Sequence, residues 1–283
     1  MKKIIGFIKI IRPINCVMMG FAVIVGAIIS AGNVIEESLM NLVFGFITAF
    51  MLTGASMTIN DYYDREIDAI NEPSRPIPSR LISPSESIAI SIILAVIGLV
   101  SAILTHQICF ILALISLLIS ALYSRSGKHV GLLGNFMVST CVSIPFIYGG
   151  VCVKGLIEPN TAIFAAMAFL ANTGREIIKG ITDIEGDRLR CIKTLAISYG
   201  PRRASQIALI FFVMAVALSP LPIILKIVNI WFIPLLLIAD IGFMISSINI
   251  VKNVTKENAK KTKKAILIWM LISLIAFLIG TVK

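Results

Sequence analysis

Charged residues are scarce in this sequence of 283 residues: they make up 14% of the chain, against 58% hydrophobic residues. The mean hydropathy of +0.97 lies far from that of a water-soluble globular domain. Histidine occurs only twice, and the five cysteines show no paired spacing. These shortages exclude a disulfide framework and a zinc site built from cysteine and histidine ligands. They leave a protein whose main solvent is the lipid bilayer.

Successive apolar runs in the sequence are long enough to cross a bilayer as helices. We therefore predict an all-α fold in which residues 1–283 form one domain, a bundle of nine transmembrane helices with a central cavity and a polar cytoplasmic cap. The predicted spans are, in order, Pro13–Ala31, Leu39–Ile59, Ser87–Thr105, Ile108–Tyr123, Leu132–Val153, Asn160–Ile178, Ala204–Leu221, Ile230–Ile250 and Ala265–Thr281.

Basic residues are distributed very unevenly between the two sides of this predicted bundle. All but three of the 25 lysines and arginines fall on one side, and the exceptions are Lys154, Lys226 and Lys283. The positive-inside rule then places the N-terminus in the cytoplasm and the C-terminus outside it. The net charge of +10 belongs to this asymmetry and to anionic lipid head groups, not to nucleic acid. We predict a multi-pass protein of the cell membrane with membrane lipids as neighbours and no evident obligate protein partner.

The most polar stretch follows directly on the second predicted span and reads Asn60-Asp61-Tyr62-Tyr63-Asp64-Arg65-Glu66-Ile67-Asp68. Its three aspartates, at i, i+3 and i+7, fall on one face if the helix continues through them. Carboxylates gathered in this way repel one another unless a cation lies between them. Such hard oxygen ligands suit Mg²⁺, which one or two carboxylates commonly hold together with substrate phosphates. We predict a metal–phosphate site at the mouth of a membrane cavity, near its cytoplasmic face.

A proline-rich segment, Pro73–Arg80, comes next. Three prolines in six residues forbid a regular helix and favour an extended course. Arg75 and Arg80 can reach phosphate oxygens from this segment, and the alternative is a role as positive-inside anchors. Ser83 and Glu86 then have the spacing of a capping box, which predicts a helix start.

A second polar centre contains Lys179, Asp183 and Asp187. The two aspartates are four residues apart, so one helical face again presents two carboxylates, and Lys179 precedes Asp183 by one turn. Both acidic clusters follow even-numbered predicted helices and therefore emerge on the same side of the membrane. Ordinary solvated loops have no need of such matched spacings. We predict that the two clusters are the halves of one metal-binding clamp.

Other polar residues within or beside the apolar runs are weaker candidates. Asn15 and Asn135 lie just inside predicted helices, where an amide equally often makes a helix–helix hydrogen bond. Lys128 can meet an anionic head group or serve only to orient the chain. Asp240 lies midway along the eighth predicted span, so it has either a functional role or a structural partner there.

The pattern Asn60-Asp-x-x-Asp64-x-x-x-Asp68, followed by Arg75-Pro-x-Pro-Ser79 and later by Asp183-x-x-x-Asp187, resembles the motifs of the UbiA-type intramembrane prenyltransferases. The resemblance covers the whole chain in helix count, motif order and spacing. It is strongest to the archaeal ether-lipid branch of that family, through Asn60 to Asn71, Tyr123-Ser124, Lys128, Gly134-Asn135 and Glu185 to Arg188. Where relatives often have glycine, this chain has Arg80 and Cys191, and Gly180 and Thr182 follow Lys179 in place of a more usual Lys-Asp pattern.

The resemblance implies an enzyme that uses Mg²⁺ to transfer a geranylgeranyl group from geranylgeranyl diphosphate to the free hydroxyl of geranylgeranylglyceryl phosphate. Its partners would be an isoprenyl diphosphate donor and an isoprenyl glyceryl phosphate acceptor. The resemblance assigns metal binding and catalysis to Asp61, Asp64, Asp68, Asp183 and Asp187, with Lys179 as a further catalytic residue. It assigns substrate binding to Asn15, Asn60, Arg65, Arg75, Tyr123, Lys128 and Asn135.

Two other functions remain open at the level of the sequence. A prenyltransferase with an aromatic acceptor, such as a quinone precursor, would use the same diphosphate clamp. A cation-coupled secondary transporter is the less favoured alternative, because transporter sites lie near the bilayer midplane and both acidic clusters lie at one face. No inverted repeat of the two halves of the chain is evident either.

Overall fold

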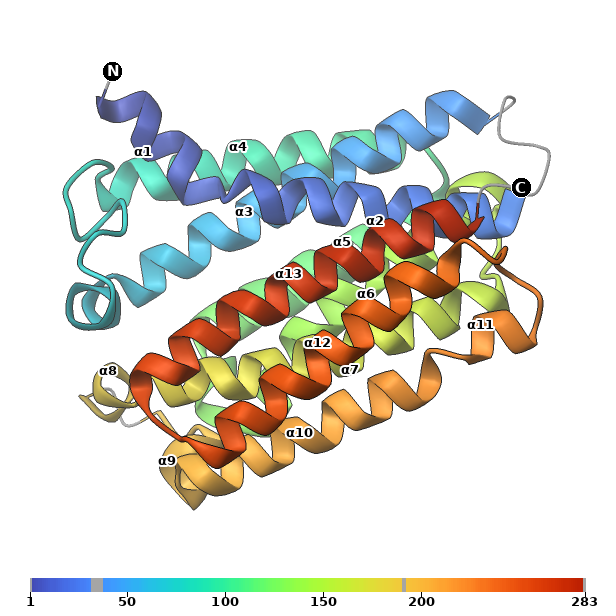
Figure 1. Cartoon of the computed structure of the whole chain (residues 1–283). Helices are drawn as coiled ribbons and strands as arrows, with labels where there is room; N and C mark the ends of the chain where they lie inside the picture. Colours follow the sequence, from blue (N-terminus) through green and yellow to red (C-terminus); the bar gives the residue numbers. More distant parts are fainter. Residues whose placement is uncertain (1, 32–37, 190–191, 282–283) are drawn as a thin grey trace.

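The computed structural model of this chain describes residues 2–31, 38–189 and 192–281, and the secondary structure of this part is entirely helical. Figure 1 shows the long helices running side by side as one bundle, with α1 beginning at one end and α13 finishing at the other. The predicted all-α fold is confirmed. Cys191, one of the departures from the family pattern, lies outside the described residues.

Each predicted span corresponds to one long helix of the bundle. These helices are α2 (Pro13–Ala31), α3 (Leu39–Asn71), α4 (Pro84–Ile103), α5 (Gln107–Arg125), α6 (Leu132–Lys154), α7 (Pro159–Thr182), α10 (Pro201–Leu218), α12 (Phe232–Lys252) and α13 (Lys256–Thr281). Short helices precede or connect them, namely α1 (Lys2–Ile11), η2 (Gly127–Val130), α8 (Ile184–Leu189), α9 (Leu195–Tyr199) and α11 (Leu221–Ile224).

Eight helical segments in the described part of the chain are long and apolar enough to cross a membrane. The exception among the long helices is α7, whose second half carries Arg175, Glu176 and Lys179. The count of nine membrane spans therefore stays a prediction, although α7 is 24 residues long and packs within the bundle. Outward faces carry large exposed apolar side chains, such as Ile92 and Ile93 on α4, which suit contact with lipid.

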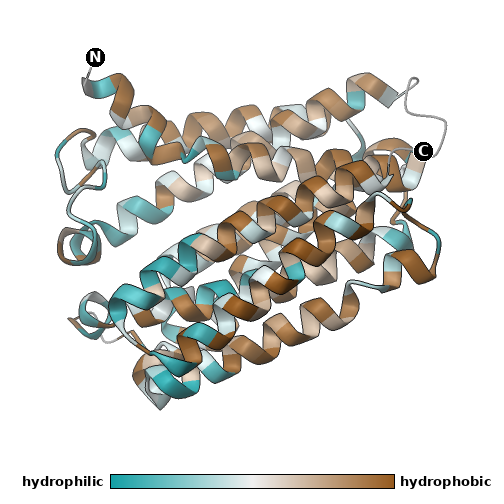
Figure 2. Cartoon of the chain, viewed as in Figure 1, coloured by the Kyte–Doolittle hydropathy of each residue, from teal (hydrophilic) through white to brown (hydrophobic). Residues whose placement is uncertain are grey.

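Polar residues gather at one end of the bundle. Figure 2 shows hydrophilic residues around α8, α9, the end of α3 and the beginning of α13, while the opposite parts of the long helices are mostly hydrophobic. This polar end is where the sequence predicts a polar cap. That the cap faces the cytoplasm remains a prediction.

Two glycines bring α2 and α6 into close contact. A Cβ atom at Gly26 would lie 1.9 Å from the carbonyl oxygen of Phe146, and one at Gly149 would lie 1.9 Å from that of Val23. Only hydrogen fits in either place, so these backbones touch directly, as small residues allow in membrane helices. The contact fixes two of the helices that enclose the central cavity.

The segment from Pro73 to Arg80 is folded into successive turns, so the predicted extended course is wrong. The amide of Ser79 donates to the carbonyl of Arg75 at 2.9 Å, and the amide of Leu81 donates to that of Pro76 at 2.9 Å. The φ angle that proline imposes is compatible with turns as well as with extended chain, which explains the error. Arg80 has a φ of 59°, in the left-handed region that favours glycine. The capping box of Ser83 and Glu86 at the start of α4 is confirmed.

Candidate active site

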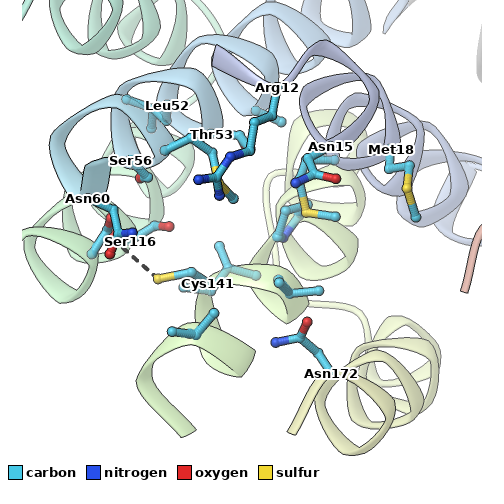
Figure 3. A pocket seen from close by; sticks show the side chains of 18 of the residues that line it. Arg12, Asn15, Met18, Leu52, Thr53, Ser56, Asn60, Ser116, Cys141 and Asn172 are labelled. Atoms are coloured by element: carbon cyan, nitrogen blue, oxygen red, sulfur yellow. Dashed lines mark hydrogen bonds between the residues drawn. The ribbon is translucent and has the colours of Figure 1, made fainter. Parts of the chain in front are cut away.

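A large cavity of about 470 Å³ lies between α2, α3, α5, α6, α7 and α13. Its polar end is lined by basic and amide side chains and one carboxylate: Arg12, Asn15, Asn60, Arg75, Asn172, Arg175, Glu176, Lys179 and Lys263. Its remaining walls are mostly apolar and include Met18, Val23, Leu52, Ala113, Val142 and Met270. Figure 3 shows Arg12, Asn15, Asn60 and Asn172 pointing into this space from three sides.

A smaller pocket of about 50 Å³ adjoins the large cavity, and we call it the carboxylate pocket. The side chains that line both spaces are Arg75, Tyr123, Glu176 and Lys179. The acidic residues that line the carboxylate pocket come from both predicted clusters: Asp64 and Asp68 from α3, Asp183 and Asp187 from the α7–α8 junction, and Glu176 from α7. The structure therefore brings the two acidic clusters together, as the sequence predicts.

The first cluster stands on an unbroken helix, because α3 continues from the apolar run to Asn71. Asp61, Asp64 and Asp68 are only 2%, 7% and 4% exposed, and they lie on one face as their spacing predicts. Each of these buried carboxylates needs positive charge nearby, because an uncompensated charge in an apolar interior is very costly. The neighbouring elements supply that charge.

Three basic residues from outside the α3 cluster bind its aspartates. Arg75 donates to Asp68 at 2.6 Å and lies 3.4 Å from Asp61. Lys128 forms an ion pair with Asp64, whose other oxygen accepts from the amide of Asn60 at 2.9 Å. Arg12 donates to Asp61 at 2.5 Å. These contacts include two residues predicted to bind substrate phosphate, Arg75 and Lys128.

The second cluster lies where a helix breaks. Asp183 is the residue after α7, and its side chain accepts a hydrogen bond from the hydroxyl of Thr182 at 2.7 Å. The amide of Asp187 donates to the carbonyl of Asp183 at 2.9 Å, so one helical turn still relates the two aspartates across the break. Asn71, the last residue of α3, donates to the same carbonyl at 3.3 Å and ties the two clusters together.

The backbone of α8 lies directly against side chains of α3. A Cβ atom at Gly186 would lie 2.4 Å from the side-chain nitrogen of Asn71 and 2.7 Å from Ile67, so a larger residue there would force these side chains to shift. Asp187, next in the chain, is 7% exposed. Burial, and then the charge of Asp183, raises the pKa of Asp187 to about 7. The ionised form of this carboxylate is therefore short of positive charge in its present surroundings, which a divalent cation would supply.

The remaining predicted site residues differ in where they lie. Tyr123, Lys179 and Asn135 line the carboxylate pocket, Asn15 and Asn60 line the large cavity, and two others line neither space.

Asp61 lines neither space and lies behind them, bound to its arginines. Arg65 also lines neither space: it contacts the carbonyl of Tyr62 at 2.9 Å and the carboxylate of Glu66 at 3.6 Å. A position next to Asp64 is about 100° away around the helix, which turns Arg65 from the carboxylate face.

Four charged residues at the cavity were not among the predicted site residues: Arg12, Arg175, Glu176 and Lys263. Glu176 is 7% exposed and lies between two cations, Arg175 at 2.9 Å and Lys179 at 3.2 Å. A signal existed in the sequence, since ionisable residues inside a membrane segment indicate a functional site. Arg12 has a φ of 51°, between α1 and α2, and no sequence pattern predicts the direction in which it points.

Asp240 has a partner in the structure. The hydroxyl of Ser219, after the end of α10, donates to its carboxylate at 2.6 Å. Asp240 lines a separate pocket of about 50 Å³ that is otherwise mostly apolar. This contact favours the structural alternative for Asp240.

The donor set of the carboxylate pocket fits magnesium in its chemistry, since every acidic ligand is a hard oxygen. Within the described residues, no three acidic, histidine or cysteine side chains converge as a ready metal site. Magnesium typically takes one or two carboxylates and completes its shell with water and substrate phosphate, so a converged trio is not required.

Fold and site together define an intramembrane helical protein in which carboxylates and basic side chains meet at the polar mouth of an apolar cavity. The sequence model of the UbiA prenyltransferase family matches residues 19–275, and the chain belongs to this family of intramembrane prenyltransferases. The resemblance seen in the acidic motifs is thereby confirmed.

Curated relatives match over nearly the full chain. Digeranylgeranylglyceryl phosphate synthase of Methanocaldococcus jannaschii is 36% identical over 283 residues, which cover 100% of this chain and 98% of the relative. The enzyme of the same name from Methanosarcina mazei is 34% identical, with 97% of each chain covered.

Solved structures have the same fold. A structure of digeranylgeranylglyceryl phosphate synthase aligns with a TM-score of 0.75 at 35% identity and covers 99% of both chains. A UbiA homologue from Archaeoglobus fulgidus, bound to GPP and Mg²⁺, aligns with a TM-score of 0.64 at 18% identity and covers 96% of this chain and 99% of its own. At 18% identity, the similarity to the Archaeoglobus fulgidus structure supports a shared fold and nothing more specific.

Proposed function

We propose that this chain transfers a geranylgeranyl group from geranylgeranyl diphosphate to the free hydroxyl of geranylgeranylglyceryl phosphate, forming the second ether bond of an archaeal membrane lipid. The observation that carries this proposal is the carboxylate pocket, where acidic residues from α3 and from the α7–α8 junction meet beside a large, mostly apolar cavity. The choice of substrates is supported by the full-length similarity to enzymes named digeranylgeranylglyceryl phosphate synthase.

Magnesium would be held by Asp64, Asp68, Asp183 and Asp187, with Asp61 behind them on the same face of α3. When bound, it acts as a Lewis acid that neutralises negative charge on the departing diphosphate. Asp64 pairs with Lys128 and Asp68 with Arg75, so both carboxylates have positive charge beside them before substrate arrives. The same two cations are then available to phosphate oxygens.

Lys179 is placed to serve the donor diphosphate, because it lines both the carboxylate pocket and the large cavity. Together with Lys128 and Arg75, it puts fixed positive charge where the leaving group gathers electrons. Preorganised charge of this kind stabilises a transition state without reorganisation at the moment of reaction. Tyr123 packs beside these cations, with Lys128 5.6 Å from the centre of its ring.

The apolar walls of the large cavity suit the other half of the reaction. When the carbon–oxygen bond of an allylic diphosphate breaks, the positive charge on the allylic carbons is quenched by any water that reaches it. Walls formed by residues such as Met18, Leu52 and Val142 exclude water from this space. The acceptor hydroxyl can then attack the first carbon of the isoprenyl chain, with loss of its proton.

The proposal includes how the chain lies in its membrane. Residues 1–283 act as one domain, α7 crosses the membrane with the eight helical segments named above to give nine spans, and the polar end of the bundle faces the cytoplasm. The distribution of basic residues supports this orientation. Both phosphorylated substrates would then present their head groups at the cytoplasmic side while their tails stay in the bilayer.

The decisive experiment offers the purified full-length protein geranylgeranyl diphosphate and Mg²⁺ with a panel of acceptors: prenylated glyceryl phosphate, hydroxybenzoate and dihydroxynaphthoate. We expect diphosphate release and an ether product with the first acceptor only, and none when EDTA removes the metal. Release with an aromatic acceptor instead would assign the chain to quinone-type chemistry. No release with any acceptor would overturn the proposed prenyl transfer.

A further inference from the structure

Positive charge is unevenly distributed around the polar end of the large cavity. On the α3 side, the three buried aspartates are matched by Arg12, Arg75 and Lys128, which contact them directly. On the opposite side, α7 and α13 contribute three cations around one buried carboxylate, Glu176: these are Arg175, Lys179 and Lys263. Among the residues that line the large cavity, the wall formed by α7 and α13 therefore carries three cations and one carboxylate, while Asp183 and Asp187 face the carboxylate pocket.

Arg175 has donor capacity that its neighbours do not use. One terminal nitrogen donates to Glu176 at 2.9 Å, while its Nε is buried and has no acceptor within the described part of the chain. A buried donor without an acceptor costs about 1–3 kcal/mol, so such an atom calls for an explanation. The Nε atom itself is enclosed, so the donors that Arg175 can offer to a ligand in the large cavity, which its side chain lines, are those of its terminal nitrogens.

Lys263 lies on the same wall. It belongs to the first turns of α13, which packs against α7, and it is 17% exposed. Its nearest carboxylate, that of Glu72, is 4.0 Å away, at the outer limit of an ion pair. Four charged groups lie within electrostatic range of Lys263, with Asp183 acting most strongly, followed by Lys179, Glu72 and Arg175. The next residue, Lys264, is exposed and lines neither the cavity nor the carboxylate pocket.

These two residues stand apart from the cations assigned to the donor. Lys128, Arg75 and Lys179 line the carboxylate pocket, whereas Arg175 and Lys263 line only the large cavity. The reaction proposed above needs a second anionic group in that cavity, because the acceptor carries its own phosphate and its hydroxyl must reach the donor. Arg12 also lines the cavity, but it already contacts Asp61 at 2.5 Å and the sulfur of Met57 at 3.1 Å.

We propose that Arg175 and Lys263 form a binding site for the phosphate monoester of the acceptor. An arginine offers paired donors to phosphate oxygens, and a lysine adds a point charge. This inference rests on the proposed prenyl transfer to a glyceryl phosphate, and it names the residues that distinguish a phosphorylated acceptor from a neutral one. Glu176 is a positioning residue that fixes the arginine.

The test compares two acceptors on each enzyme preparation: geranylgeranylglyceryl phosphate and geranylgeranylglycerol, which lacks the phosphate. For Arg175→Gln and Lys263→Gln, we expect the ratio of kcat/KM for the two acceptors to fall by about 10- to 100-fold, the equivalent of one charge-assisted hydrogen bond. The KM for geranylgeranyl diphosphate should stay within about twofold, because the donor contacts are elsewhere. Lys264→Gln, the matched control, should leave both quantities unchanged.

The ratio does not depend on how much of a variant is folded, because both acceptors are measured on one preparation. A wild-type enzyme that uses the two acceptors equally well, or variants that keep the wild-type ratio, would overturn the phosphate site while leaving the prenyl transfer intact. A rise in the donor KM without a change in the ratio would assign these cations to the diphosphate instead. A wild-type enzyme that transfers to neither acceptor would overturn the proposed function itself.

Discussion

The acidic residues of α3 and those of the α7–α8 junction reach one pocket from backbones of different kinds. On α3, Asp64 and Asp68 stand on an unbroken helix that runs on to Asn71. At the other side, Asp183 ends α7 and Asp187 belongs to the short helix that follows. The continuous helix fixes the spacing of the first pair, and at the junction a single backbone hydrogen bond from Asp187 to Asp183 keeps the second pair one turn apart.

The two clusters differ also in the source of their positive charge. The aspartates of α3 are bound by residues from three other places in the chain, Arg12, Arg75 and Lys128. The α7 side carries its own cations one turn before the junction, including Lys179. If metal and diphosphate bind as proposed, the α3 cluster would have to exchange its present partners, whereas the α7 side already has Lys179 facing the carboxylate pocket.

The largest effect should follow from loss of either half of the clamp. We expect Asp64→Ala and Asp187→Ala each to lower kcat by about 100-fold or more, and EDTA to abolish turnover of the wild-type enzyme, since the metal neutralises the leaving group. Diphosphate release is the measurement. Glu66→Gln is the control, because this side chain is 66% exposed and lines neither space. Near-normal turnover in either variant would rule out a two-sided clamp.

A smaller effect is expected at a single cation. Lys128→Gln removes the partner of the buried Asp64 and the contact proposed for the donor diphosphate, so we expect the KM for geranylgeranyl diphosphate to rise by about 10-fold or more. Steady-state kinetics at saturating acceptor would measure it. Arg125, three residues earlier and exposed, supplies the control Arg125→Gln. An unchanged donor KM would show that Lys128 serves only to balance charge on α3.

The contact between α8 and α3 can be tested by replacing Gly186. Gly186→Ala puts a methyl group 2.4 Å from Asn71, which should push α8 from α3, cost about 1–3 kcal/mol of stability and lower kcat. Thermal unfolding in detergent and turnover are the two measurements. Gly180→Ala is the matched control for stability, because its Cβ would lie 3.6 Å from Thr194, an ordinary contact distance; it is no control for turnover, since Gly180 lines the carboxylate pocket. Equal stability of the two variants would contradict the tight contact between α8 and α3.

The smallest effect separates two arginines that the sequence predicts alike. Arg65→Gln should leave kcat/KM within about twofold of wild type, since exposed ion pairs contribute little. Arg75→Gln should lower it strongly, because Arg75 contacts Asp61 and Asp68 and lines both spaces. Parallel kinetics of the two variants would measure the difference. Comparable losses of kcat/KM in the two variants would show that Arg65 does contribute to substrate binding.

Much of the fold could be predicted because it depends on local pattern. A run of about 20 apolar residues specifies a helix that crosses a bilayer, whatever lies beside it. The helical spacing of Asp61, Asp64 and Asp68 likewise placed them on one face before any contact was known. Pro73–Arg80 was harder, because proline limits one backbone angle and leaves the other to be fixed by neighbours.

The site could be predicted only in part for a related reason. Charge type and spacing identify which residues are candidates, but the partner of a buried charge comes from another helix. Glu176 and Arg175 stood in the sequence as charges near a helix end, and only packing made them part of a cavity wall. Lys263 belonged to a lysine-rich run, and its burial sets it apart from the exposed Lys264.

By itself the sequence determined that this is a helical membrane protein with two acidic clusters on one side, since length, apolarity and spacing are properties of the chain alone. The tertiary structure decided which cation meets which carboxylate, that Arg65 turns away, and that Arg175 and Lys263 share a wall. The physical reason is the separation along the chain of the groups that interact. Helix formation is settled within a few residues, whereas ion pairs and cavities depend on groups that only packing brings together.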